Sequence, residues 1–215
     1  MELEIDNFSV DYNFPTTVYQ INKPEYLSIV SPVLNLYINN SLNESNLDPI
    51  YPGIQTQVIS GEESIEPFVR YISDISWDVL NSQGYDMDLY YTDAMAMWGH
   101  YHDHLSGMEQ HVHGLGAQLT GFYFVDVPED SCLLYFYDPR PAKVYANLVE
   151  RQGKSVTPAH TMVYYKPKAG DLFFAPAWLA HSFTRNKSTA PFKFVHINVH
   201  VVLRENNNQS APVII

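Results

Sequence analysis

The sequence contains a single cysteine, Cys132, in 215 residues. One thiol cannot form a disulfide within its own chain, and disulfides accumulate in oxidising compartments. The first residues, Met1 to Glu4, are acidic and lack the basic start of a secretory signal peptide. We therefore expect a cytoplasmic protein in which Cys132 is a small buried apolar side chain.

Positive charge is also scarce. The chain has 12 Lys and Arg residues against 24 Asp and Glu residues, and its formal net charge is −12. An acidic chain repels phosphate backbones, so this balance argues against a nucleic acid as the partner. The expected substrate is a small molecule or another protein.

Long hydrophobic runs and several common enzyme motifs are missing. The longest apolar run, residues 172–180, is too short to cross a bilayer and contains Pro176. The chain has no phosphate-binding loop, no dinucleotide-binding glycine motif and no Gly-x-Ser-x-Gly nucleophile motif. We therefore expect no membrane segment and none of the enzyme classes that depend on these motifs.

Aromatic residues, in contrast, are abundant: 16 Tyr, 11 Phe and 3 Trp. Hydrophobic residues make up 46% of the chain and charged residues 17%, which is the composition of a globular protein. A chain of this length can bury a full core by itself. We expect one domain over residues 1–215.

The first part of the chain has helical periodicity. Residues 23–40 place apolar side chains on one helical stripe, and Pro32 within this stripe predicts a break or a late start of the helix. Residues 62–83 predict a second helix, with Pro67 near its beginning. The polar segment 39–52 predicts a loop.

The second part of the chain is rich in β-branched and aromatic segments that are separated by turn residues. The predicted strand regions are residues 88–102, 116–127, 131–139, 161–177 and 192–203. Helices followed by closely spaced strands indicate a mostly β fold with N-terminal helices, built on a jelly-roll or cupin-like barrel. We divide the domain into a mainly helical support (1–87), a β-barrel core (88–204) and a tail (205–215).

Three histidines form a candidate metal site. His111 and His113 are two residues apart, so on an extended chain their side chains share a face. His181 follows an apolar strand that ends at Pro176. Three His ligands suit Zn, whereas two His and a carboxylate suit non-haem Fe(II).

Several motifs in chain order resemble the family of iron(II)/2-oxoglutarate oxygenases common in phages and marine bacteria, which is related to the prolyl hydroxylases. The resemblance covers roughly residues 12–200, in the order Phe14-Pro15-Thr16, Trp98, His111-Val112-His113, Thr120-Gly121-Phe122-Tyr123-Phe124, Asp138-Pro139-Arg140, Pro167-Lys168-Ala169-Gly170-Asp171 and Pro176-Ala177-Trp178-Leu179-Ala180-His181.

This resemblance implies a double-stranded β-helix with iron at its mouth. It also implies Fe(II) as the metal and 2-oxoglutarate as the co-substrate, with decarboxylation to succinate coupled to oxidation of a second substrate, in the cytoplasm of a cell or of an infected host. The predicted activity is a hydroxylation. The implied iron ligands are His111, His113 and His181.

The first departure from the family concerns the third iron ligand. Related oxygenases have Asp or Glu two residues after the first His, and this chain has His113 there. Either His113 is a ligand, or Glu109 or Asp103 replaces it, or water occupies the position.

The second departure concerns the base that pairs with the distal carboxylate of 2-oxoglutarate. Relatives have an Arg on the last strand, where this chain has Pro191 and Phe192. We expect Lys193 to serve instead, with Arg185 and Arg140 as alternatives. Lys cannot make the bidentate contact of Arg, and the strand's alternation could turn Lys193 outward.

Other side chains are assigned supporting roles. Tyr123 is expected to line the barrel and hydrogen-bond a carboxylate. Trp178 is expected to pack against the barrel and orient His181. The second histidine cluster, His100, His102 and His104, is interpreted as an exposed loop or strand end, or alternatively as one strand face beside the site. His160 and His196 are interpreted as structural.

Two other functions fit the sequence. One is a cupin-like metalloenzyme with three His ligands that does not use 2-oxoglutarate. The other is a non-catalytic binding protein on the same scaffold, because a fold alone does not define an activity. A basic side chain inside the barrel would favour the oxygenase.

Overall fold

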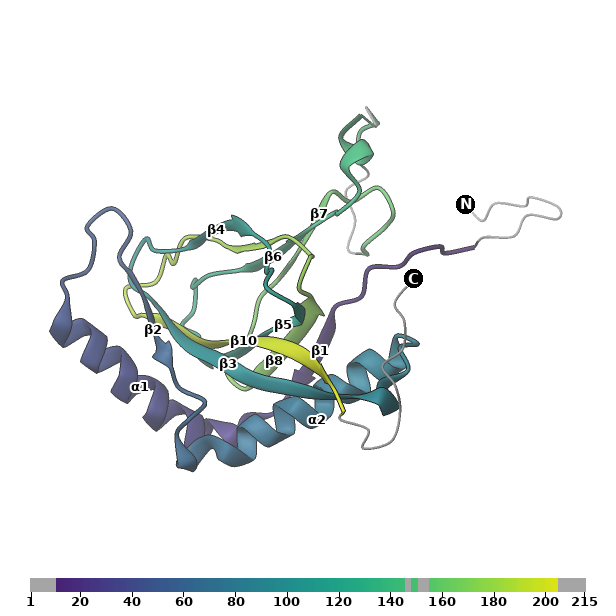
Figure 1. Cartoon of the computed structure of the whole chain (residues 1–215). Helices are drawn as coiled ribbons and strands as arrows, with labels where there is room; N and C mark the ends of the chain where they lie inside the picture. Colours follow the sequence, from purple (N-terminus) through teal and green to yellow (C-terminus); the bar gives the residue numbers. More distant parts are fainter. Residues whose placement is uncertain (1–10, 146–147, 151–154, 205–215) are drawn as a thin grey trace.

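The computed structural model describes residues 11–145, 148–150 and 155–204. The predicted tail, 205–215, therefore lies outside the described residues, as do residues 1–10. Two α-helices, α1 (Leu27–Glu44) and α2 (Glu66–Ser82), lie beneath a large β-sheet, on the same side of it (Figure 1). Short 3-10 helices occur at η1 (Pro24–Tyr26), η2 (Glu63–Ile65), η3 (Met87–Leu89) and η4 (Pro141–Tyr145).

The larger sheet is antiparallel throughout its described pairs, with the strand order β1-β8-β5-β10-β3-β2. Its strands are β1 (Tyr19–Asn22), β2 (Gly53–Val58), β3 (Tyr90–His102), β5 (Ala117–Asp126), β8 (Asp171–Pro176) and β10 (Phe192–Leu203). Strand β10 lies between β5 and β3, so both edges of this last strand are paired.

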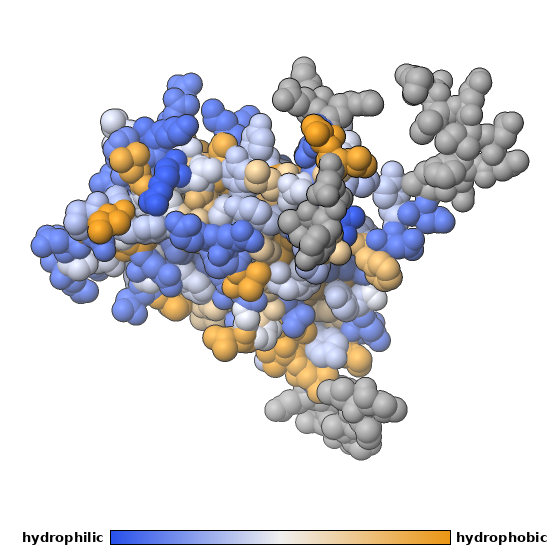
Figure 2. Space-filling model, turned by 90° about the horizontal axis from the view of Figure 1, so that it is seen from above, coloured by the Kyte–Doolittle hydropathy of each residue, from blue (hydrophilic) through white to orange (hydrophobic). Residues whose placement is uncertain are grey.

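The smaller sheet faces the larger one and has the order β4-β9-β6-β7 (Figure 1). Its strands are β4 (Met108–His111), β6 (Leu134–Tyr137), β7 (Met162–Tyr165) and β9 (His181–Phe183). From above, over this sheet, the surface is mainly hydrophilic with scattered hydrophobic residues (Figure 2). The predicted mostly β fold with N-terminal helices is confirmed.

The alternation of side chains along the strands divides the core into two parts. On β10, Val195, Ile197 and Val199 pack on the helix side, together with the buried stripe of α1. Phe192 and Phe194 point the other way, into the space between the two sheets. This inter-sheet core is largely aromatic, and Phe183 of β9 stacks on Phe194 with a ring-centroid distance of 4.6 Å.

Several predicted boundaries need correction. Helix α1 runs through Pro32 and continues to Glu44, into the predicted loop. Proline removes one intrahelical hydrogen bond, but Val30 and Val33 on either side are buried against the sheet and hold the helix together. Strands β1 and β2 lie within the region predicted to be mainly helical, and they form the two edges of the large sheet.

Candidate metal centre

Three histidines converge where the small sheet meets the turn between β8 and β9. His111 of β4 and His181 of β9 are direct partners across the antiparallel pair, and their ring centroids are 4.5 Å apart. His113 follows β4, and its backbone N–H donates to the carbonyl of Ala177 at 2.8 Å. That bond fixes the end of β4 to the turn that carries His181.

The side-chain geometry suits a single ion. Each histidine offers one nitrogen, and these three nitrogens all lie within 4.8 Å of one another. The Nε2 atoms of His113 and His181 are 3.3 Å apart, and the two rings are nearly parallel, at 10°. His181 is fully buried, whereas His111 and His113 are partly exposed, so the site is open on one side.

Backbone carbonyls orient two of these rings. The Nδ1 of His111 lies 2.8 Å from the carbonyl oxygen of Glu109, and the Nδ1 of His181 lies 2.9 Å from that of Leu179. A carbonyl oxygen can only accept, so each Nδ1 carries the proton and each Nε2 keeps a free lone pair. The unprotonated nitrogens are those that a metal would require.

Burial keeps two of these imidazoles, those of His113 and His181, neutral. It lowers the pKa of His113 to about 4, with a further contribution from His111. Burial also lowers the pKa of His181 to about 3, although the hydrogen bond to Leu179 opposes the shift. Neutral imidazole is the form that binds metals, so the donor set is competent for a divalent cation such as Fe(II).

The alternative carboxylates lie outside this group. The Glu109 side chain is 82% exposed and faces Arg185. Asp103 accepts a hydrogen bond from the backbone N–H of His104, next to it in the chain. Within the described residues, the cluster that could hold a metal contains three histidines and no carboxylate.

The interior behind the site contains three more histidines. His196 of β10 has its ring centroid 4.5 Å from that of His113, and its Nε2 lies 2.9 Å from Thr120 Oγ1. His100 accepts a hydrogen bond from Trp98 Nε1 at 2.9 Å. His100 and His102 are 6% and 4% exposed, so their interpretation as exposed was wrong. The i, i+2 spacing on a strand was the signal for a shared inward face, and His104 is exposed because β3 ends before it.

The structure does not bring the predicted co-substrate residues into this interior. Lys193 lies on the helix side of β10, where its Nζ is 2.9 Å from Asp126 and donates to Asn35 at 2.7 Å. Tyr123 also faces the helices, and its hydroxyl donates to the carbonyl of Lys23 at 2.8 Å. Both expectations are corrected, because strand alternation directs these side chains away from the small sheet.

The two arginines also lie outside this interior, at the surface. Arg140 makes a bidentate pair with Asp138 and is 60% exposed. Arg185 lies over the ring of Tyr51 and donates to the carbonyl of Leu105. Among the described residues, no buried side chain is Lys or Arg.

Trp178 does not pack against the barrel as predicted. It is 55% exposed, whereas its neighbours Ala177 and Leu179 are buried. The turn that joins β8 to β9 is closed by a hydrogen bond from Leu179 N–H to the carbonyl of Pro176. This turn directs Leu179 inward and Trp178 outward.

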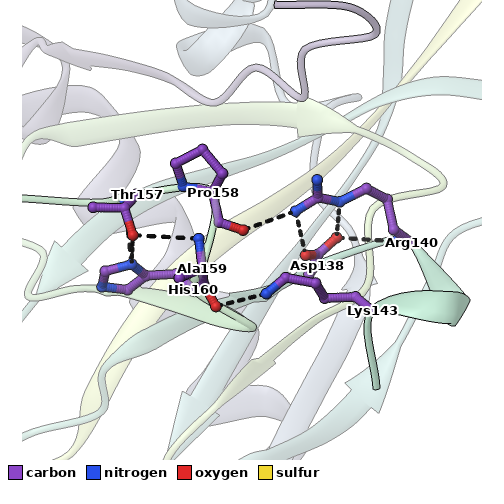
Figure 3. A network of polar contacts seen from close by, with 7 residues as sticks. All are labelled: Asp138, Arg140, Lys143, Thr157, Pro158, Ala159 and His160. Atoms are coloured by element: carbon purple, nitrogen blue, oxygen red, sulfur yellow. Dashed lines mark hydrogen bonds and ion pairs between the residues drawn. The ribbon is translucent and has the colours of Figure 1, made fainter. Parts of the chain in front are cut away.

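A groove of about 1100 Å³ lies beside the centre but does not include its histidines. Phe136 and Leu179 form the wall between them, and the ring of Phe136 is 6.1 Å from that of His181. Arg140 and Lys143 brace another wall by donating to the carbonyls of Pro158 and Ala159 (Figure 3). These bonds hold together the two ends of the β6–β7 connection.

Comparisons with known proteins show the fold and a family match over part of the chain. The sequence model of the family described as "Putative 2OG-Fe(II) oxygenase" matches residues 96–192, which include His111, His113 and His181. A search of curated protein sequences found no match.

Solved structures with the same fold include enzymes described as alpha-ketoglutarate-dependent. The carbocyclase SnoK from nogalamycin biosynthesis has a TM-score of 0.61 at 11% identity, covering 89% of this chain and 83% of its own. A Pseudomonas putida prolyl-4-hydroxylase has a TM-score of 0.56 at 9% identity, covering 86% and 93%.

The epimerase SnoN, solved with Fe3+ and alpha-ketoglutarate, has a TM-score of 0.57 at 11% identity, covering 93% of this chain and 89% of its own. These TM-scores establish the double-stranded β-helix fold, and the family match covers the strands of the centre. The family match over residues 96–192 indicates an Fe(II)/2-oxoglutarate-dependent oxygenase, and the cluster of three histidines could hold its iron.

Proposed function

We propose that this oxygenase hydroxylates its substrate at an iron centre held by His111, His113 and His181. The observation that carries this proposal is the convergence of three imidazole nitrogens within 4.8 Å. Fe(II), when bound, supplies the redox chemistry that couples decarboxylation of 2-oxoglutarate to oxidation of the substrate. A set of three neutral ligands leaves the charge of Fe(II) to be balanced by the anionic co-substrate.

Aromatic side chains shield the buried side of the centre. The ring of Phe122 lies 5.0 Å from that of His181 in an edge-on arrangement. The ring of His196 stacks on the same phenylalanine, with the two centroids 5.2 Å apart. These side chains exclude water from behind His181 and restrict access to the side of His111 and His113. A substrate would therefore approach from that partly exposed side.

The substrate is proposed to be a small molecule or a protein. Support comes from the names of the structural relatives, which include a prolyl-4-hydroxylase and enzymes of nogalamycin biosynthesis. The net charge of −12 argues against a nucleic acid. No described helix is long and apolar enough to cross a membrane. We place the reaction in the cytoplasm of a cell or of an infected host, on the basis of the single cysteine.

Anaerobic titration with Fe(II), with and without 2-oxoglutarate, tests this proposal. Chelation of Fe(II) by the 2-oxo acid gives a weak visible charge-transfer band, which should grow to one equivalent of iron per chain. Loss of the band in a His181→Ala variant with an intact fold would locate it at this centre.

The rival functions give different results. A three-His metalloenzyme that does not use 2-oxoglutarate would bind the metal but show no such band. A non-catalytic protein on this scaffold would bind neither ligand, and it would form no succinate when oxygen is admitted.

A further inference from the structure

We propose that His102 is the residue that receives the distal carboxylate of 2-oxoglutarate, with Ser106 fixing its tautomer. This inference rests on the proposed iron centre. It concerns a contact with the end of 2-oxoglutarate that does not bind the iron. It replaces the basic residue that the sequence led us to seek on β10. His102 is on β3, the strand next to β10, and its direct cross-strand partner is Phe192.

The side chain of His102 lies deep between the two sheets. Its ring is stacked on Phe194, with centroids 5.8 Å apart, and lies 6.3 Å from Phe192 and 6.4 Å from Phe183. Phe183 is the next inward-facing residue after His181 on β9. His102 is therefore placed one step deeper than the metal centre, on the same interior surface.

One ring nitrogen of His102 has a partner and the other has none. Its Nδ1 lies 2.9 Å from the hydroxyl of Ser106, which is itself fully buried. Its Nε2 is buried without a hydrogen-bond partner. When the Ser106 hydroxyl donates to Nδ1, the proton of the neutral ring is on Nε2, the nitrogen that has no partner.

The surrounding backbone is built to hold this pair. Asn186, fully buried, donates from its side chain to the carbonyl of His102 at 3.0 Å, and its backbone N–H donates to the carbonyl of Ser106 at 2.7 Å. Gly53 on β2 leaves the necessary room, because a Cβ there would lie 2.8 Å from Ser106 Oγ and 3.5 Å from His102 Nδ1. Contacts from Gly53, Ser106 and Asn186 thus hold the ring of His102, whose Nε2 has no other partner.

The chemistry of 2-oxoglutarate matches this donor. Its 2-oxo acid end chelates a metal, which leaves a second carboxylate to be accommodated in the interior. A carboxylate is an acceptor and is costly to bury without a donor or a cation. No Lys or Arg is among the buried side chains of the described residues, whereas His102 offers a free N–H. A carboxylate at Nε2 would also favour the protonated ring and so gain a charge-assisted bond.

The test compares 2-oxoglutarate with 2-oxopentanoate, which has the same chain length but no distal carboxylate. The dissociation constant of each is measured from the anaerobic charge-transfer band at saturating Fe(II). His102→Phe keeps an aromatic ring but removes the donor, and should weaken 2-oxoglutarate binding about 10- to 100-fold, the usual effect of losing a hydrogen bond to a charged group. Fe(II) affinity and the binding of 2-oxopentanoate should change less than about threefold.

Matched variants complete the design. His102→Gln retains an N–H donor and should recover part of the affinity, and it also serves if His102→Phe does not fold. Lys193→Met, on the opposite face of the sheet, should leave 2-oxoglutarate binding unchanged. The inference is overturned if His102→Phe binds 2-oxoglutarate as the wild type does. If His102→Phe does not fold, the inference is overturned when the single variants His102→Gln and Ser106→Ala both bind 2-oxoglutarate as the wild type does. Absence of the band in the wild type would instead refute the proposed function.

Discussion

His113 and His181 place their Nε2 atoms 3.3 Å apart, with their rings almost parallel, although 68 positions separate them in the chain. In the metal-free protein one Nε2 can carry a proton and donate it to the other, and a metal ion would take the place of that proton. The pair therefore identifies the position at which a cation would lie, and His111 completes the donor set.

Substitution of His113 tests its role as a ligand. His113→Leu removes one of three donors and should weaken Fe(II) binding by more than the roughly 10- to 100-fold typical of losing an outer partner of a metal ligand. His113→Asp replaces it with a carboxylate, a donor that suits Fe(II), and should retain binding. Anaerobic Fe(II) titration gives both constants. Normal binding by the Leu variant would show that water or a carboxylate is the third ligand.

Acid should destabilise the metal-free protein before its carboxylates titrate. Burial lowers the pKa of His102 and His113 to about 4 and that of His181 to about 3, from an ordinary value of 6.5. The unfolded chain therefore takes up these protons first, and the free energy of unfolding falls as the pH drops from about 6.5 towards 4. Each such histidine contributes up to about 1.4 kcal/mol per pH unit.

Chemical denaturation between pH 4 and pH 8, with a chelator present, measures this slope. The His102→Phe variant provides the control, because it lacks one of the titrating groups and should show a shallower dependence. A stability that does not change across this range would contradict the burial of neutral imidazoles in the folded state.

Leu179, rather than Trp178, should support the turn that carries His181. Leu179 is 1% exposed, so Leu179→Ala should lower the free energy of unfolding by about 2–5 kcal/mol, as for other buried leucines. Trp178→Ala should change it by less than about 1 kcal/mol and leave Fe(II) affinity intact, since this side chain is 55% exposed. Thermal unfolding and iron titration of the two variants provide the comparison.

Tyr123 should act in stability and not in co-substrate binding. Its buried hydroxyl donates to the carbonyl of Lys23 and ties the segment between β1 and η1 to β5 of the large sheet. Tyr123→Phe should cost about 0.5–1.5 kcal/mol in the free energy of unfolding, the net value of one hydrogen bond. The dissociation constant of 2-oxoglutarate should be unchanged. A selective rise in that constant would place Tyr123 at the site after all.

Alternation along a strand was readable in the sequence, but the direction of each face was not. On β10, the residues that include Lys193 and those that include Phe192 form two faces, and both contain apolar side chains. Helices α1 and α2 cover the first face, which places Lys193 beside Asp126 and leaves Phe192 between the sheets. The same packing turns Tyr123 towards the helices, so two expected co-substrate residues were wrong for one reason.

The sequence alone determined the strand-rich core, the two helices and the pair His111 and His113, because alternation, helical periodicity and i, i+2 spacing are local properties of the chain. Only the tertiary structure decided that β4 pairs with β9, which brings His181 to that pair. It also decided that His102 is buried with a free nitrogen. These outcomes depend on which sheet face the helices cover and on contacts between distant segments, and no local pattern encodes either.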